Sequence, residues 1–315
     1  MIEEIRLPRK DLVFMDTTTI PIIGFIGFGE AAFHISKGLR QDGIQAIHAF
    51  DVMADHPSAG IKIKERMETA EVNKDNSLEV LIKNCDVIFC ATSAKYALEI
   101  AQDVANSFMK GKMYIDLNSA SPSIKKEVAA VIETVGGLFV DAAVMAPVPP
   151  YGHKVPMLVS GTGAAKYELL MKQFGMDITF ISETAGISSA MKMFRSIFMK
   201  GFTSLLLETL SASHEAGVDK EILASVQETL SGSTIEELAN LLITRTAIHA
   251  ERRVTEMNEV VATLNEMKLD ATMAKAVKTK LQSIADMNLK NYFHGNVPTH
   301  YSDVLVAISE RSTIK

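Results

Sequence analysis

Near its start the chain carries a β-rich run at residues 22–26, which leads directly into the sequence Gly-Phe-Gly-Glu-Ala-Ala and a helical pattern. In such a G-x-G-x-x-A turn, the first glycine permits the tight turn and the second lets the backbone approach a pyrophosphate. The alanine lets the helix pack on the strand. The positive end of the helix then faces the phosphates. The pattern therefore predicts dinucleotide contacts at Gly27, Phe28, Gly29, Glu30, Ala31 and Ala32.

An acidic residue follows the next β-rich run. Asp51 lies 24 residues beyond Gly27, close to the spacing of about 20 that is typical of an acid on the adenosine ribose hydroxyls. A turn or helix cap is the alternative role. The residues after it contain no arginine for a 2′-phosphate and include a second acid, Asp55. We therefore expect NAD as the cofactor, with NADP the less favoured choice.

Glycine and proline are distributed unequally along the 315 residues. Residues 1–182 hold 13 of the 18 glycines and 8 of the 9 prolines. Frequent turn formers suit alternating short strands and helices, whereas a tract nearly free of them suits long helices. We therefore predict two domains, a dinucleotide-binding domain at residues 1–182 and a helical substrate and dimerisation domain at residues 183–315.

The first domain is predicted to be α/β, with a Rossmann-type doubly wound parallel sheet, because β-rich runs alternate with helical patterns. Strands are expected at residues 22–26, 46–50, 87–91, 113–116, 138–141, 157–160 and 178–181. Helices are expected at residues 30–41, 77–84, 95–108, 123–135 and 164–174. The second domain is predicted to be all-α: a long interdomain helix at 188–216, then helices at 220–229, 234–248, 251–268, 272–287 and 301–310.

Charge and composition exclude several classes of protein. The 32 basic and 38 acidic side chains give a net charge of −6, shared by both domains, which argues against nucleic acid as the main partner. No apolar run approaches the roughly 18–20 residues that cross a bilayer, and residues 1–21 lack the apolar core of a signal peptide. We expect a cytoplasmic protein without membrane contact. Cys85 and Cys90 are spaced for neither zinc nor a disulfide framework, so both are predicted to be buried thiols, and no metal site is expected.

Polar residues follow two neighbouring strands of the predicted sheet. Ligands of such sheets bind outside the carboxyl ends of the strands. Thr92 and Ser93 follow one strand, and Asn118 and Ser119 follow the next. We expect these side chains near the nicotinamide half of a cofactor, although Asn118 could instead shape the turn. Ser121, directly before Pro122, is interpreted as a helix cap.

These motifs resemble those of the β-hydroxyacid dehydrogenase family, which includes the 3-hydroxyisobutyrate and 6-phosphogluconate dehydrogenases. The similar segments are residues 24–29, the loop at 116–122, the loop at 141–147 and the segment at 186–196. A little-characterised phosphogluconate-dehydrogenase-like branch with a distinctive C-terminal helical domain is the most similar. The resemblance implies transfer of a hydride between the nicotinamide and a small hydroxyacid or related polar alcohol.

The resemblance also assigns the chemistry. Lys192 matches the family's lysine and is the expected general acid/base, since burial and cationic neighbours can lower a lysine pKa from about 10.4 toward 7–8. Ser119 is expected to contact the substrate. Met145 replaces the serine of the substrate loop, and Arg195 and Ser196 replace paired asparagines. Arg195 could receive a substrate carboxylate and Ser196 the reacting oxygen, although both fit equally well as surface residues.

Two other functions stay open on the sequence alone. Imine reductases share the two-domain build, so the chain could reduce a C=N bond. The departures from the family motifs could also leave a dinucleotide-binding module without catalysis. In each case the partner is a small molecule, with an anionic one expected for the dehydrogenase. A homodimer is the expected assembly, because a long apolar helix in a small domain often packs on a second copy.

Overall fold

The computed structural model describes residues 20–108 and 110–312. The segment before Ile20, which is predicted not to be a signal peptide, lies outside the described residues. Two compact units divide between Arg195 and Ser196, later than the predicted boundary after residue 182. The division falls inside a helix because one uninterrupted helix passes from the first unit into the second.

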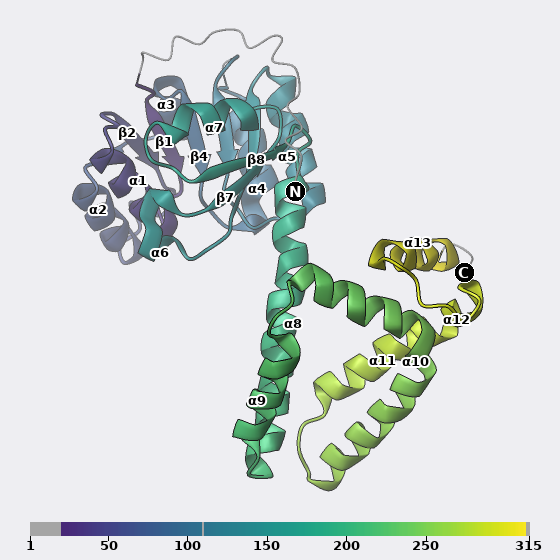
Figure 1. The fold of residues 1–315 in the computed structure, drawn as a ribbon. Helices are drawn as coiled ribbons and strands as arrows, with labels where there is room; N and C mark the ends of the chain where they lie inside the picture. The colour runs from purple at the N-terminus through teal and green to yellow at the C-terminus, as the bar shows by residue number, and fades with distance from the viewer. Residues whose placement is uncertain (1–19, 109, 313–315) are drawn as a thin grey trace. The chain divides into compact units, whose positions relative to one another are not determined.

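The first unit contains a single sheet whose order is β3-β2-β1-β4-β5-β6-β7-β8 in the part of the chain described (Figure 1). The strands are parallel except for β6 and β7, which pair antiparallel, so the expectation of a parallel sheet is corrected at that pair. The strands are β1 (Ile23–Ile26), β2 (Ile47–Phe50), β3 (Asn73–Lys74), β4 (Val87–Cys90), β5 (Met113–Asp116), β6 (Leu138–Val144), β7 (Met157–Ser160) and β8 (Ile178–Ser182).

The central strands β1, β4 and β5 are buried at every residue. Alternate side chains enter two separate cores, because successive residues of a strand point to opposite faces. Phe25 and Phe89 stack in one core with ring centroids 5.0 Å apart, whereas Tyr114 lies in the other with Cys90. A sheet covered on both faces explains why these strands are continuously apolar.

Helices flank both faces of this sheet (Figure 1). Most match their predicted positions within a few residues, but α2, α6, the 3-10 turn η2 and strand β3 are not anticipated from the sequence. The helix expected at 95–108 begins as a separate 3-10 turn. The helical elements of the first unit are α1 (Glu30–Gln41), α2 (Ala59–Thr69), α3 (Leu78–Asn84), η1 (Ala94–Tyr96), α4 (Ala97–Ala105), α5 (Pro122–Thr134), α6 (Val148–Tyr151), η2 (Gly152–Lys154) and α7 (Ala164–Lys172).

The long predicted helix is present as α8 (Ile187–Glu215). The described part of the second unit is helical throughout, with α9 (Asp219–Leu230), α10 (Ile235–Glu266), α11 (Thr272–Asp286), α12 (Leu289–Tyr292) and α13 (Tyr301–Ser312). The two helices expected at 234–248 and 251–268 are both present within α10, on either side of a kink at His249, whose backbone is non-helical. A small core that includes Ala247, Ile284 and Val304 joins α10, α11 and α13.

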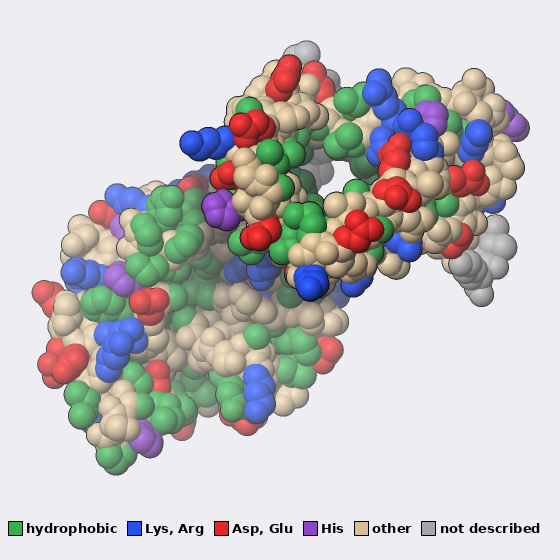
Figure 2. All heavy atoms as spheres, turned by 90° about the horizontal axis from the view of Figure 1, so that it is seen from below, with side chains coloured by type: hydrophobic (Ala, Val, Ile, Leu, Met, Phe, Trp, Pro, Cys, Tyr) green, Lys and Arg blue, Asp and Glu red, His purple; other side chains and the backbone are tan. Residues whose placement is uncertain are grey.

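Among residues 20–108 and 110–312, no helix combines the length and apolarity that a membrane span needs. In the same residues, no cluster of three His, Cys, Asp or Glu side chains could hold a metal ion. Cys85 and Cys90 are free and buried, as predicted. Figure 2 shows acidic and basic side chains interspersed over the visible face, consistent with the net charge of −6.

Candidate active site

The glycine loop between β1 and α1 is built as the motif predicts. Gly27 has φ +80°, and a Cβ there would lie 2.6 Å from Thr92 Cγ2 and 2.8 Å from the Ala91 carbonyl oxygen, so only glycine fits. A Cβ at Gly29 would meet no protein atom within 4 Å. Gly29 precedes α1 without offering a side chain to cap it. The loop thus leaves open space in front of a positive helix end, as a bound phosphate group would need.

Asp51 follows β2 and faces this loop. Its carboxylate accepts hydrogen bonds from the Phe28 N–H at 2.7 Å and the Met53 N–H at 2.8 Å. The Phe28 side chain is fully buried and packs edge-on against Phe25. The Phe28 side chain therefore packs in the core, and a cofactor contact at Phe28 stays a prediction. Ala32 is also fully buried, where it packs in the core, while Glu30 and Ala31 reach the surface.

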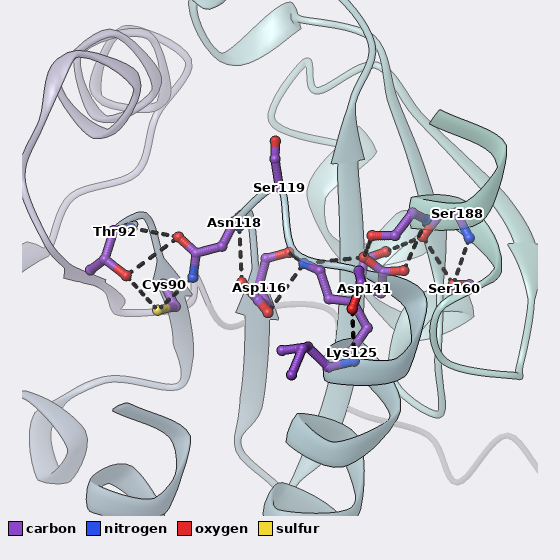
Figure 3. Close-up of polar contacts among 12 residues, drawn as sticks. Cys90, Thr92, Asp116, Asn118, Ser119, Lys125, Asp141, Ser160 and Ser188 are labelled. Atoms are coloured by element: carbon purple, nitrogen blue, oxygen red, sulfur yellow. Dashed lines mark hydrogen bonds and ion pairs between the residues drawn. The ribbon is translucent and has the colours of Figure 1, made fainter. Parts of the chain in front are cut away.

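Asn118 fastens the loop after β5 to the loop after β4 (Figure 3). Its side-chain oxygen accepts the Thr92 N–H at 2.8 Å, and its amide nitrogen lies 3.3 Å from Cys90 Sγ. Asn118 is only 5% exposed, so this predicted cofactor residue holds the two loops together. Ser93, by contrast, is exposed.

Two neighbouring residues have structural roles. Burial raises the pKa of Cys90 to about 11, which keeps this thiol protonated near neutral pH. Ser121 caps α5 through the Ile124 N–H, as predicted.

Two predicted site residues, 73 positions apart in sequence, meet at the carboxyl end of the sheet. Lys192 Nζ donates a hydrogen bond to Ser119 Oγ at 3.1 Å. Ser119 is exposed just beyond β5, and its hydroxyl points away from the buried polar residues in Figure 3. Lys192 is half-buried in the second turn of α8. The Lys192 side-chain nitrogen and the Ser119 hydroxyl therefore lie together at the carboxyl end of the sheet, the end that also carries the glycine loop.

A buried ionic cluster lies beneath this pair and is not predicted from the sequence. Lys125 Nζ lies 3.1 Å from Asp116 Oδ2 and 3.2 Å from Asp141 Oδ1, with all three side chains at most 1% exposed. Lys125 also donates to the Asp116 carbonyl oxygen at 2.8 Å. Burial raises the pKa of Asp116, although the Lys125 ammonium opposes that shift. A sequence signal did exist, since both aspartates end neighbouring predicted strands, at 113–116 and 138–141.

Serine residues attach the start of α8 to the same cluster (Figure 3). Asp141 accepts the Ser189 N–H at 3.0 Å and the Ser189 hydroxyl at 2.7 Å. The Ser188 hydroxyl donates to the Asp141 carbonyl oxygen at 2.7 Å, and the Ser188 N–H donates to Ser160 Oγ at 3.1 Å. Gly186, with φ +88°, precedes the helix, and a Cβ there would lie 2.7 Å from the Pro122 carbonyl oxygen. The first turn of α8 is thus fixed to β6 and β7.

The other expected substrate residues, Met145, Arg195 and Ser196, are half-buried or exposed. Met145 lies directly after β6, half-buried, and its N–H donates to the Pro156 carbonyl oxygen at 2.8 Å. Arg195 and Ser196 follow Lys192 by about one helical turn on α8. Arg195 is exposed and Ser196 half-buried. Their roles toward a substrate stay predictions.

Comparison with known proteins gives matches along most of the chain. Residues 22–120 match the family described as NADP oxidoreductase, coenzyme F420-dependent, and residues 213–284 match a domain of unknown function, DUF1932. A conserved hypothetical protein from Sinorhizobium meliloti is 34% identical, with 94% of this chain and 98% of that chain covered and a TM-score of 0.61. Mitochondrial 3-hydroxyisobutyrate dehydrogenase from Mus musculus is 26% identical over 217 residues. That match spans 67% of this chain and 62% of the mouse enzyme's length.

Imine reductases share the fold. A variant of the Myxococcus stipitatus imine reductase in complex with NAD+ is 17% identical, with 87% of this chain and 99% of that chain covered and a TM-score of 0.70. The sheet order, the glycine loop and these relatives define an oxidoreductase-type dinucleotide fold. The chain belongs to the β-hydroxyacid dehydrogenase family, in the branch that carries the DUF1932 domain at its C-terminal end.

Proposed function

We propose that the protein is an NAD(H)-dependent oxidoreductase that interconverts a small hydroxyacid, or a related polar alcohol, and its carbonyl form. The observation that carries the proposal is the 3.1 Å contact between Lys192 Nζ and Ser119 Oγ at the carboxyl end of the sheet. Ligands of this fold bind at that end of the strands. The open space at Gly29 lies at the same end, where β1 gives way to α1.

The residues present fit a nicotinamide dinucleotide. The pyrophosphate would lie at the N-terminus of α1 beside Gly29, and the adenosine ribose beside Asp51. When bound, the cofactor accepts or donates the hydride of the reacting carbon. Lys192 would transfer the proton: in oxidation its Nζ, as the neutral amine, takes the hydroxyl proton as the C–H hydride leaves, and in reduction the resulting ammonium returns that proton to the oxygen. Ser119 would hydrogen-bond the same oxygen and keep it beside the Lys192 Nζ.

An anionic substrate suits the charges on this helix. Lys192 and Arg195 stand three residues apart on α8, so both belong to neighbouring turns of one surface. A guanidinium offers a planar fork that matches a carboxylate. The mouse relative's name identifies a hydroxyacid substrate, 3-hydroxyisobutyrate. A small acid with a β-hydroxyl group is therefore the first substrate class to test.

Replacing the lysine tests its role. Lys192→Ala should lower kcat by about 10²- to 10⁴-fold, the usual contribution of a general acid/base, while the NADH dissociation constant changes little. The assay is NADH formation with a panel of small hydroxyacids, and NADH binding is followed by fluorescence. Lys37→Ala, which removes an exposed lysine of α1, is the matched control. Equal turnover in the parent and Lys192→Ala would overturn the assignment.

Cofactor choice is tested at Asp51. Asp51→Ala should weaken NAD binding relative to NADP binding by about tenfold, because the carboxylate that would bind the ribose hydroxyls and repel a 2′-phosphate is lost. Asp51 also accepts the Phe28 N–H. A variant that acted only by loosening this loop would weaken NAD and NADP binding alike and leave the ratio of the two affinities unchanged. Asp51→Asn keeps an oxygen acceptor and removes only the charge, so it should shift the ratio in the same direction. A parent protein that already prefers NADPH would contradict the proposal.

The substrate panel also separates the alternative functions. Reduction of cyclic imines without activity on hydroxyacids would favour C=N chemistry. Tight NADH binding without turnover on any alcohol, carbonyl or imine would identify a binding module. Because the chain has no tryptophan, the fluorescence of bound NADH is read without an indole background.

A further inference from the structure

The buried Asp116, Lys125 and Asp141 cluster is unusual for the interior of a sheet domain. Three ionisable side chains lie within 3.2 Å contacts at no more than 1% exposure. Taking such groups out of water is costly, and apolar residues of similar volume often give equal or greater stability. Stability alone therefore does not explain the cluster.

The cluster spans adjacent strands at a single level of the sheet. Asp116 is opposite Asp141 in the pairing of β5 with β6, and Asp141 is opposite Ser160 in the pairing of β6 with β7. Lys125 enters from α5, directly after β5. The single ammonium therefore contacts both carboxylates that the strand register brings together.

Asp116 connects the cluster to Ser119 through a hydrogen bond to the preceding residue, Asn118. Asp116 Oδ1 accepts the N–H of Asn118 at 2.9 Å. Asn118 in turn is held by the Thr92 N–H at 2.8 Å. Because Ser119 is the next residue, the position of its backbone follows from these two bonds.

Asp141 connects the cluster to Lys192 through hydrogen bonds to Ser189 in the same helix. Both oxygens of the Asp141 carboxylate accept hydrogen bonds from Ser189, one from its N–H and one from its hydroxyl. Lys192 lies three residues further along α8, which is helical without interruption from Ile187. Since a helix of this length moves as a rigid unit over one turn, fixing Ser189 fixes the point from which the Lys192 side chain extends.

We propose that Asp116, Lys125 and Asp141 are positioning residues that set the distance between Lys192 Nζ and Ser119 Oγ. The proposal rests on the function proposed above for Lys192. Without the ammonium, two carboxylates would face each other in a dry site, and one would have to take up a proton or move apart. Protonation or displacement of Asp141 alters how it holds Ser189, and an error of about 1 Å at a reacting group can cost on the order of 100-fold in rate.

Lys125→Met is the direct test, because methionine keeps most of the side-chain volume and loses the charge. We expect kcat on the best hydroxyacid of the panel to fall about 10- to 100-fold, while the NADH dissociation constant stays close to that of the parent. Lys126→Met, a change at the next residue of α5 where the side chain is exposed, should leave both quantities unchanged. The double variant Lys125→Met/Asp116→Asn should regain part of the lost kcat, because the two carboxylates no longer repel each other.

Several outcomes would overturn the positioning role. These are an unchanged kcat in folded Lys125→Met, a parallel loss of NADH binding, or no recovery in the double variant. If Lys125→Met does not fold, Ser189→Ala removes only the hydroxyl bond to Asp141 and should lower kcat several-fold at unchanged NADH affinity. An unchanged kcat in Ser189→Ala would then decide against the proposal.

A readout without a substrate separates this proposal from the proposed function. Crystal structures of the parent and Lys125→Met, or Ser189→Ala, report the distance between Lys192 Nζ and Ser119 Oγ directly. A longer distance in the variant supports positioning even if the parent turns over no compound of the panel. An unchanged distance contradicts positioning even if Lys192 is shown to be the acid/base.

Discussion

The two glycines of the glycine loop show that one residue type can be required for two different reasons. Gly27 and Gly29 occupy the same motif for different reasons. Gly27 is required by the protein itself, since its φ is +80° and two atoms lie within 2.8 Å of the site of a Cβ. Gly29 has an ordinary φ of −77° and free space around it, so the fold alone does not require a glycine there.

Gly29→Ala therefore separates folding from cofactor binding. The variant should unfold at the same temperature as the parent, because the methyl group meets no protein atom within 4 Å. NADH binding should weaken by about tenfold or more, because the methyl group would occupy the space needed by the pyrophosphate. The measurements are thermal unfolding without cofactor and an NADH binding titration.

Gly201→Ala is the matched control, since a Cβ at Gly201 in α8 also meets nothing within 4 Å. It should leave NADH binding unchanged and stabilise the helix slightly, by up to about 1 kcal/mol. Unaltered NADH binding by Gly29→Ala would contradict placement of the pyrophosphate at this loop.

Elements were predictable where burial gives a strong pattern. The strands β5 and β7 match their predicted ranges, because each is a short apolar run between turn residues. Helix α2 buries only Gly60 and Met67, and β3 has two exposed residues. Their sequences carry almost no hydrophobic periodicity, so they were not predicted.

Helix α8 combines two different faces. Phe194, Ile197 and Phe198 are spaced to share one side, with Phe202 and Leu205 continuing it. Phe198 and Phe202 stack with ring centroids 6.0 Å apart. Lys192 and Ser196 fall on the opposite side by the same helical spacing. One helix thus carries both the proposed catalytic lysine and an exposed apolar stripe.

At the scale of the whole molecule, we propose that this stripe is covered by a second copy of the chain. Phe194 is 67% exposed, Ile197 74% and Phe198 57% in the single chain. Exposed contiguous apolar surface of this kind marks an interaction site, and two-fold dimers are the commonest closed assembly. The parent should elute in light-scattering chromatography with twice the mass of one chain.

The double substitution I197E/F198E should convert that dimer to a monomer with unchanged helical circular dichroism, because two carboxylates cannot be buried unpaired in an apolar contact. Leu207→Glu changes an apolar residue of α8 that is also exposed, at 64%, but lies off the stripe. It should stay dimeric. A parent that is monomeric at micromolar concentration would rule out the proposed contact.

The sequence by itself determined the class of fold, the place of the glycine loop and the division into an α/β part and a helical part. These follow from local physics: turn residues, apolar periodicity and the few residues that tolerate a positive φ. It also identified Ser119 and Lys192 as candidates, because segments 116–122 and 186–196 resemble motifs of the β-hydroxyacid dehydrogenase family.

Only the tertiary structure decided which polar groups meet. Lys125, on a helix, is drawn between two aspartates because the register of β5 and β6 aligns their carboxylates. Asn118 binds the loop that follows β4, and the side chain of Phe28 packs in the core. Such pairings join residues far apart along the chain, so they depend on strand register and helix packing, which no local pattern records.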